Sequence, residues 1–376
     1  MSVTVSTSPY RFSWFDWFCL WYPPGWLILF NRHWQHYKTD PDGWKWFEYG
    51  LFLLPCGFYI ALFIRWLRLG CRAPASNQVE PDPVYQKAFQ QEILAPILKH
   101  YFRGVLYQTE NLFVSGPLIV AMNHAGMCFP WDFMGLGLLL SQVQERFVQP
   151  LAHPIFFDHP WLVWWLPRGW AQVLGGVRAE RQSFEAALAS VCGDRTLEAT
   201  PEPIVKDVVL LYAPEGWRGL AKGWQQRYQL ASFDPSFVRL SLRYRVPIVP
   251  VICIGSEYLH PYTFNVRRLA QWLKLPMFPI SPLILAFLLF PSLGVWAVRT
   301  RLQYFIQPVW RPWEEDANGA TGEGESETGR CHGWGSCGKG QRSQRAISYQ
   351  MAEGLRLRLQ AEIDQIRKRL HDLTGT

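Results

Sequence analysis

Short apolar runs alternate with amphipathic stretches through most of the chain after residue 84. The apolar runs have the length of buried strands and occupy residues 116–124, 146–153, 206–212, 246–257 and 302–310. The amphipathic stretches have helical periodicity and occupy residues 84–102, 131–144, 180–191 and 236–245. Strands that alternate with helices are typical of a parallel sheet covered on both faces. We therefore expect an α/β fold in which helices flank a mostly parallel central sheet.

The residues before this alternation contain a long apolar run. Residues 49–64 carry no charge, and Arg65, Arg68 and Arg72 follow them. The run is shorter than the roughly 20 residues that a membrane-spanning helix needs, and Pro55 lies inside it. A marginal span, a re-entrant hairpin, an interfacial helix and a buried core helix are all compatible with this pattern.

Composition divides the chain into four parts. Residues 1–72 are rich in aromatic side chains and have no obvious partner in the α/β part, so we expect a membrane-associated helical segment there. A polar, proline-rich stretch then opens an α/β domain over residues 73–312. Residues 313–345 contain much Gly and Glu and few large aliphatic side chains, which predicts a flexible insertion. Residues 346–376 have apolar side chains at helical spacing, which predicts an amphipathic C-terminal helix.

A second apolar stretch, residues 276–298, is interrupted by Pro279, Pro282 and Pro291. Because proline ends or kinks a helix, we expect short helices here. They would lie against lipid or cover an apolar tunnel, and a single spanning helix is less consistent with the spacing of the prolines.

The overall composition favours a membrane surface as a partner and disfavours nucleic acid. Aromatic residues make up 16% of the chain, with 20 Trp, and the net charge is +7. Trp and Tyr favour the membrane–water interface, and a basic surface attracts anionic lipids and ligands. No zinc finger or basic-aromatic platform for nucleic acid is present in the sequence. The scattered cysteines are typical of reduced thiols, so we expect a membrane-associated protein whose α/β domain faces the cytoplasm.

A polar cluster ends the first apolar run of the α/β part. The sequence AMNHAGMCFPWDF at 121–133 places Asn123, His124, Cys128 and Asp132 close together. Parallel sheets bind ligands at the carboxyl ends of their strands, which is where this cluster falls. A histidine held by a carboxylate through one ring nitrogen can take a proton with the other. A metal site and ordinary turn chemistry are alternatives for the same residues.

Two further motifs follow later strands. APEGWRG at 213–219 offers the Glu215 carboxylate, backbone freedom at Gly216 and the Arg218 guanidinium within one turn. VPIVPV at 246–251 reads as a buried strand with irregular pairing. The sequence contains no G-x-S-x-G, no P-loop and no G-x-G-x-x-G, which disfavours serine hydrolases and nucleotide-binding or dinucleotide-binding enzymes.

Four segments, in order, resemble the conserved blocks of the glycerolipid acyltransferase superfamily, the lysophosphatidic acid acyltransferase-like proteins. The segments are NHAGMCFPWD, LGGVRA, APEGWRG and VPIVPV. The resemblance covers residues 105–312, and the agreement of four motifs in order makes it more specific than any single motif. Two further stretches look like the branch of diacylglycerol acyltransferase-like and phytyl ester synthase-like proteins. They are KGWQQRYQLASFDPSFVRLSLRYRVPIVPV and LKLPMFPISP.

The resemblance implies an acyltransferase domain over 73–312 with His124 as general base and Asp132 as its orienting partner. It implies that the substrate is held by Asn123, Arg178, Glu215, Gly216 and Arg218. The acyl donor would be acyl-CoA or acyl-carrier protein, the acceptor a lipid hydroxyl, and no cofactor or metal would be needed. If the pair acts together, a ring nitrogen of His124 should lie within about 3.2 Å of Asp132.

Two departures from the family pattern keep other functions open. Seven residues separate His124 from Asp132 where the family has four, and Ala213 stands where the family has Phe. One alternative is a metal-dependent lipid hydrolase that uses His124, Cys128 and Asp132. Another is a lipid-binding membrane protein without turnover.

A second group of metal-ligand types lies in the Gly-rich insertion. It consists of Cys331, His332 and Cys337, which follow no standard zinc spacing.

Overall fold

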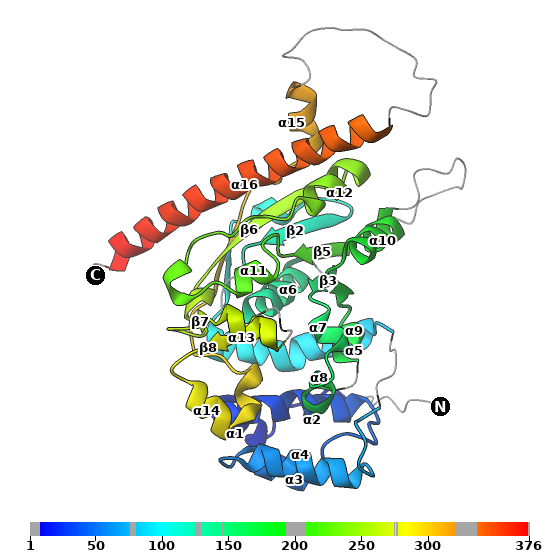
Figure 1. The fold of residues 1–376 in the computed structure, drawn as a ribbon, viewed down its shortest axis with the longest axis vertical. Helices are drawn as coiled ribbons and strands as arrows, with labels where there is room; N and C mark the ends of the chain where they lie inside the picture. The colour runs from blue at the N-terminus through cyan, green and yellow to red at the C-terminus, as the bar shows by residue number, and fades with distance from the viewer. Residues whose placement is uncertain are drawn as a thin grey trace.

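The centre of the molecule is a seven-stranded sheet (Figure 1). The computed structural model describes residues 8–75, 80–124, 129–144, 146–167, 169–192, 208–273, 275, 277–319 and 337–374. Within these residues the strands of the sheet are β1 (Val105–Tyr107), β2 (Leu118–Met122), β3 (Phe147–Ala152), β4 (Val177–Arg178), β5 (Val208–Tyr212), β6 (Ile248–Ile254) and β9 (Gln303–Ile306). Their order across the sheet is β1-β9-β6-β2-β5-β3-β4.

The sheet is mostly parallel, which confirms the prediction from the sequence. β2 pairs in parallel with β5 and β6, and β3 pairs in parallel with β5 and β4. β9 runs antiparallel to β6 and has β1 beside it in parallel. In this register Ala121 lies between Tyr212 and Pro250. The carboxyl ends of β2, β5 and β6 therefore meet at one edge of the sheet.

Helices cover both faces of the sheet, because the side chains of its central strand alternate between two buried clusters. Leu118, Val120 and Met122 of β2 belong to one cluster, and Ile119 and Ala121 belong to the other. Helix α6 (Trp131–Gln144) packs in the first cluster. Helices α10 (Arg181–Cys192), α12 (Ser236–Tyr244) and α16 (Cys337–Thr374) pack in the second. This alternation is what a strand buried on both faces requires.

The remaining helices are shorter. Those between the N-terminal segment and β5 are α5 (Pro83–Phe89), α7 (Ile155–Asp158), α8 (Leu162–Trp165) and α9 (Trp170–Val173). Those after β5 are α11 (Trp217–Leu220), α13 (Arg267–Trp272), α14 (Ile284–Leu289) and α15 (Pro312–Gly319). Helix α5 continues through two π-helical turns to Phe102, so the helix predicted over 84–102 is confirmed.

The N-terminal segment is part of the protein core. It forms α1 (Trp14–Trp21), α2 (Trp26–Tyr37), α3 (Trp46–Phe52) and α4 (Gly57–Arg68). The fully buried Trp26 of α2 lies edge-on to Trp131 of α6 at 5.0 Å and to Phe102 at 5.8 Å between ring centroids. The Asn31 amide donates to the main-chain oxygen of Trp165 at 3.0 Å. Our expectation that residues 1–72 lack a partner in the α/β part was wrong, because α2 packs on the same face of the sheet as α6.

The apolar run 49–64 folds as two short helices. Helix α3 ends at Phe52, α4 begins at Gly57, and the rings of Phe52 and Phe58 pack 4.8 Å apart. Arg65 turns inward and donates to the main-chain oxygen of Trp164 at 2.8 Å. Among the described residues, no helix combines the length and the apolar composition needed to cross a bilayer.

The segment between β6 and β9 leaves the sheet and returns. It contains a two-stranded ribbon of β7 (Phe264–Asn265) and β8 (Pro279–Ile280), with α13 between the two strands. After the ribbon come α14 and a 3-10 turn over Pro291–Val295. The short helices predicted for 276–298 are thus present.

The C-terminal helix α16 begins at Cys337 rather than at residue 346. Its buried positions Leu355, Leu359 and Ile363 are four residues apart and pack in the second cluster, as the periodicity predicted. The side chain of Cys337, together with Cys331 and His332, lies outside the described residues.

Candidate active site

His124 and Asp132 meet at the carboxyl edge of the sheet. His124 follows the end of β2, and Asp132 lies in the first turn of α6. Nδ1 of His124 is 2.9 Å from Oδ2 of Asp132, and the two side chains are 8% and 0% exposed. The expected distance is confirmed, so a spacing of seven residues still permits contact. The connecting residues 125–128, which include Cys128, lie outside the described residues.

The Asp132 carboxylate is held in place by the start of α6 and by the sheet. Its Oδ1 accepts the Phe133 main-chain N–H at 2.8 Å. The main-chain oxygen of Asp132 accepts a hydrogen bond from the hydroxyl of Tyr304 in β9, also at 2.8 Å. Gly135 permits this contact, because a Cβ at that position would lie 2.4 Å from the Tyr304 hydroxyl oxygen. Burial raises the pKa of Tyr304 well above its ordinary value, which keeps this hydroxyl a donor.

The geometry assigns the two ring nitrogens of His124 different roles. An ionised carboxylate only accepts hydrogen bonds, so Nδ1 carries the hydrogen that Asp132 receives. Nε2 makes no hydrogen bond to any residue that the structure describes. Its lone pair is therefore the basic position of the pair, and Asp132 fixes the tautomer that exposes it.

Glu215, in the turn after β5, joins three segments around His124. Its Oε1 accepts the main-chain N–H of His124 at 3.0 Å, and its Oε2 accepts the N–H of Ala231 at 2.5 Å. The Lys222 ammonium lies 2.8 Å from Oε2, and the Glu215 side chain is fully buried. A buried carboxylate is stable only when it is paired and hydrogen-bonded in this way. These partners make Glu215 a positioning residue, and its contact with an acceptor stays a prediction.

Replacing Glu215 with glutamine should lower the free energy of unfolding by about 3–5 kcal/mol, because the Lys222 ammonium would lose its buried partner. Urea unfolding followed by circular dichroism would measure the change. Glu353→Gln is the matched control, since Glu353 pairs with Arg356 on the surface of α16 and such pairs contribute up to about 1 kcal/mol. Equal stability of the two variants would contradict the role given to Glu215.

Two glycines in this turn have separate functions. Gly216 has φ +54° and ψ −144°, a conformation that favours glycine, yet a Cβ there would meet nothing within 4 Å. Gly219 makes the close approach, because a Cβ on it would lie 2.8 Å from the main-chain oxygen of His124. Both glycines belong to the APEGWRG motif, but the sequence analysis singled out only Gly216.

Asn123 extends the pairing of β2 with β6 past the last ladder residues. Its side-chain oxygen accepts the Cys253 N–H at 2.6 Å, and its side-chain nitrogen donates to the Cys253 carbonyl at 3.1 Å. These bonds fix the direction in which the chain leaves β2 and enters His124. A contact between Asn123 and substrate stays a prediction.

The two predicted arginines lie in different places. Arg218 is exposed on α11, and its Nη1 donates to the Ser232 hydroxyl at 2.7 Å. Arg178 ends β4 and pairs with Asp158, with Nη2 2.6 Å from Oδ1. Three strand spacings of about 4.8 Å put β4 roughly 14 Å from β2. The structure therefore brings Asn123, Asp132 and Glu215 to His124 and leaves Arg178 at the edge of the sheet.

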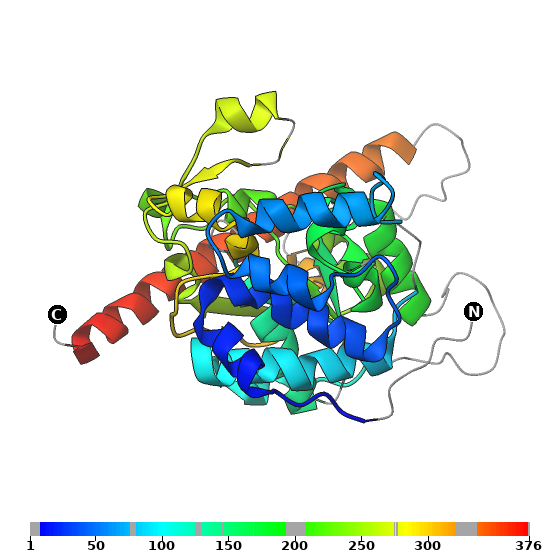
Figure 2. The same ribbon diagram turned by 90° about the horizontal axis from the view of Figure 1, so that it is seen from below.

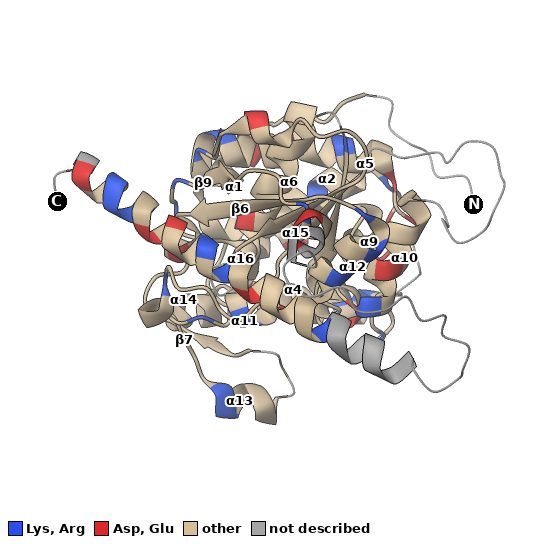
Figure 3. Cartoon of the chain, turned by 90° about the horizontal axis from the view of Figure 1, so that it is seen from above, with Lys and Arg blue, Asp and Glu red and all other residues tan. Residues whose placement is uncertain are grey.

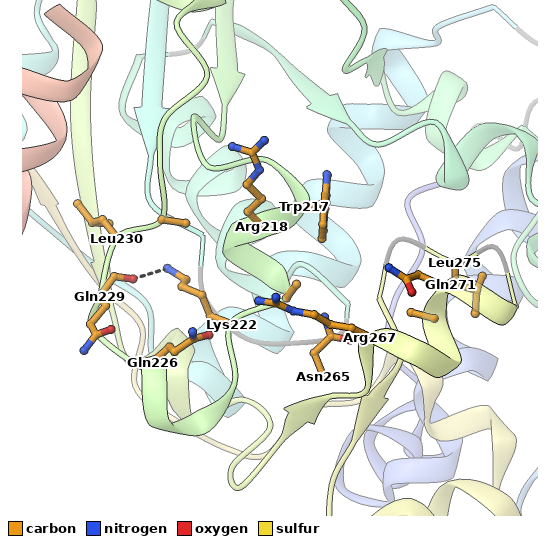
Figure 4. A pocket seen from close by; sticks show the side chains of 13 residues that line it. Trp217, Arg218, Lys222, Gln226, Gln229, Leu230, Asn265, Arg267, Gln271 and Leu275 are labelled. Atoms are coloured by element: carbon orange, nitrogen blue, oxygen red, sulfur yellow. Dashed lines mark hydrogen bonds between the residues drawn. The ribbon is translucent and has the colours of Figure 1, made fainter. Parts of the chain in front are cut away.

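A cavity of about 530 Å³ opens beside this turn (Figure 4). One wall comes from α11 and the loop after it, including Arg218 and Lys222, and the other comes from residues 265–275. Lys222 links this cavity to the buried site, because its ammonium bonds to Glu215.

The metal-dependent alternative needs His124, Asp132 and Cys128, and the structure describes only the first two of these. Within the described ranges, no three His, Cys, Asp or Glu side chains are grouped to hold a metal ion. Cys128, which that alternative requires, lies outside them.

Comparison with known proteins identifies the family that this site resembles. Residues 104–254 match the model of the Acyltransferase family. An uncharacterised protein of Mycobacterium tuberculosis is 31% identical over 205 residues, which cover 54% of this chain and 51% of the relative. A protein of Mycobacterium leprae is 30% identical over 205 residues, which cover 54% of this chain and 50% of its own. The chain thus matches about half the length of these relatives.

One solved structure, the 1-acyl-sn-glycerophosphate acyltransferase PlsC from Thermotoga maritima, is also similar. The aligned residues make up 82% of this chain and 92% of the PlsC chain, with 14% sequence identity and a TM-score of 0.35. This likeness is too weak to support a conclusion. The family match is independent of it and contains His124, Asp132, Arg178 and Glu215. Residues 104–254, less than half of the chain, are therefore similar to acyltransferases.

Proposed function

We propose that the protein transfers a fatty acyl group from an acyl thioester to the hydroxyl of a glycerolipid or a related lipid alcohol. The donor is acyl-CoA or acyl-carrier protein, and the acceptor is a lysophospholipid, diacylglycerol or a similar alcohol. The observation that carries this proposal is the 2.9 Å contact between His124 and Asp132 inside the segment that matches acyltransferases. The sequence likeness to diacylglycerol acyltransferase-like and phytyl ester synthase-like proteins favours an uncharged acceptor.

The proposed reaction needs one base and one displacement. Nε2 of His124 takes the proton of the acceptor hydroxyl, and the oxygen attacks the thioester carbonyl carbon. The tetrahedral intermediate collapses by breaking the carbon–sulfur bond, and the imidazolium returns the proton to the leaving thiolate. Asp132 stabilises the imidazolium between these two transfers. The products are the acylated lipid and the free thiol.

The test of this function is a product analysis. Purified protein is incubated with acyl-CoA or with acyl-carrier protein against lysophosphatidic acid, diacylglycerol and phytol, and the products are identified by mass spectrometry. Formation of an ester with any acceptor supports the proposal and names the substrates. Release of free fatty acid alone would favour the hydrolase, and lipid binding without product would favour the non-enzymatic alternative.

We also propose that the protein binds a membrane surface through an apolar base formed by α1, α3, α4 and α14. The exposed side chains of this base are Trp14, Trp17, Phe18, Trp21, Trp46, Phe47, Tyr59, Ile60, Phe63, Trp66, Leu67, Leu285, Leu288 and Leu289. The four helices lie together at one end of the molecule (Figures 1 and 2). The Cys56 N–H donates to the Leu289 carbonyl at 2.6 Å and joins the turn between α3 and α4 to α14.

The distribution of charge supports an orientation in which the apolar base faces the membrane and α16 faces away from it. Basic and acidic residues alternate along α16, which lies at the opposite end of the molecule (Figures 1 and 3). Large exposed apolar patches mark interaction surfaces, and Trp and Tyr are the side chains that favour the membrane interface. The α/β domain would then face the cytoplasm with its substrates drawn from the bilayer.

Changing Trp14, Trp46 and Phe63 together to serine should reduce binding to liposomes about tenfold or more, because each large apolar side chain contributes about 1.5–3 kcal/mol when fully buried. These side chains are 81%, 84% and 57% exposed, so the fold should tolerate the change. Liposome flotation measures the bound fraction. Trp272→Ser is the control, since Trp272 is 78% exposed on α13, outside the base. An equal effect of the control would contradict the proposed base.

A further inference from the structure

The wall of the cavity opposite Arg218 belongs to an arm, which we define as residues 264–280. The arm consists of the β7–β8 ribbon and α13, and it projects from the body of the molecule (Figures 2 and 3). Its sequence contains Arg267, Arg268 and Lys274 and no Asp or Glu. The arm thus brings positive charge to a cavity whose other wall is the turn that positions His124.

The lining of the cavity is cationic and includes no acidic side chain. Of its three cations, Lys222 is paired with Glu215, and Arg218 bonds to the neutral Ser232. Arg267 makes no ion pair or hydrogen bond to any residue in the described ranges. A guanidinium without an internal partner is suited to bind an anion from solution with two parallel hydrogen bonds.

The shape of the cavity indicates an anion that is part of a larger molecule. Its volume of about 530 Å³ is within the range of sites for small molecules and larger than a free phosphate needs. Amide side chains line it beside the arginines, among them Gln226, Gln229 and Asn265. Figure 4 shows Arg267 reaching from the arm toward Lys222, with Asn265 next to it. These groups fit a phosphate ester with a polar body.

The cavity is connected to the base through one carboxylate. Lys222 bonds to Oε2 of Glu215, and Oε1 of the same side chain accepts the His124 N–H. A phosphate bound by the arm would therefore lie beside the turn that positions His124.

We propose that Arg267 binds a phosphate group of a substrate and that the arm is a specificity element for phosphorylated substrates. This inference rests on the proposed acyl transfer and deepens it. The phosphate belongs either to the carrier of the acyl donor, as in CoA, or to a phosphorylated acceptor. Arg218, on the opposite wall, is a separate group, so the cavity holds two arginines for phosphate oxygens.

The experiment measures binding by the full chain without turnover. Isothermal titration with CoA represents the donor, and titration with glycerol 3-phosphate represents the acceptor. Arg267→Ala should weaken binding of one of the two about tenfold or more, as expected when a hydrogen bond to a charged group is lost. Arg268→Ala is the matched control, because Arg268 is the next residue on α13 and does not line the cavity.

Weaker binding of CoA alone would assign the subsite to the donor, and weaker binding of glycerol 3-phosphate alone would assign it to the acceptor. The inference is overturned if Arg267→Ala binds both ligands as the unaltered protein does, if Arg268→Ala has the same effect, or if the unaltered protein binds neither ligand. The two proposals fail separately. Arg267-dependent binding without ester formation would refute the acyl transfer, whereas ester formation with unchanged binding would refute only the subsite.

Discussion

Replacing His124 with alanine should lower the rate of acyl transfer by about 10²–10⁴-fold, which is what a positioned general base contributes. The loss should fall on the rate constant kcat, because the removed group acts on the proton in flight rather than on substrate binding. His371→Ala is the matched control, since His371 is exposed near the end of α16. Near-normal turnover by His124→Ala would contradict the proposed mechanism.

Asp132→Asn should be nearly as severe, although the asparagine has the same shape. The side-chain NH₂ of asparagine can donate to Nδ1 of His124, which would move the ring hydrogen to Nε2 and remove the basic lone pair. Circular dichroism must show the native fold in both variants. Tyr304→Phe separates positioning from catalysis, because it removes only the hydroxyl that holds the Asp132 main-chain oxygen. It should cost less activity than Asp132→Asn.

Removing residues 1–72 should leave a chain that aggregates or lacks cooperative unfolding, rather than a soluble folded domain. Trp26 and Phe30 are fully buried in the cluster that also contains α6. Truncating one such aromatic costs about 3–5 kcal/mol, and whole domains are stable by about 5–15 kcal/mol. The free energy lost with these two side chains alone is therefore comparable to the free energy of unfolding of a whole domain. Size-exclusion chromatography and a urea titration would measure the outcome.

A pair of point variants tests the same packing without a deletion. Trp26→Ala should lower the free energy of unfolding by about 3–5 kcal/mol, since Trp26 is 0% exposed. Trp14→Ala should change it by about 0.5 kcal/mol or less, since Trp14 is 81% exposed. A fragment that starts at residue 73 and unfolds cooperatively would show that the α/β part needs no N-terminal helices.

The centre of the site was predictable because strand ends obey simple geometry. The apolar runs identified β2, β5 and β6, and parallel strands place the residues that follow them at one edge. That rule alone brings His124 near Glu215. The contact with Asp132 needed the family resemblance as well, because the spacing of seven residues gave no reason for the side chains to meet.

The parts that could not be predicted involve contacts between distant residues. Tyr304 reaches Asp132 from β9, 172 residues away, and it belongs to no motif. Lys222 opens a stretch whose family likeness was noted, but nothing in the sequence indicated that it pairs with Glu215. The prediction for the N-terminal helices was wrong for another reason. Aromatic and aliphatic residues suit both lipid and a protein core, so composition could not show that α2 is buried while one face of α4 is exposed.

The packing of Trp26 against Trp131 also sets the order in which this protein can fold during its synthesis. The two rings are 5.0 Å apart in space and 105 residues apart in the chain. At about 5–20 residues per second the ribosome needs about 5–20 s to make the intervening segment. During that time α2 has emerged without the helix that will cover it. A nascent chain with such an uncovered aromatic helix exposes an apolar surface that chaperones, or a nearby bilayer, can bind until folding is complete.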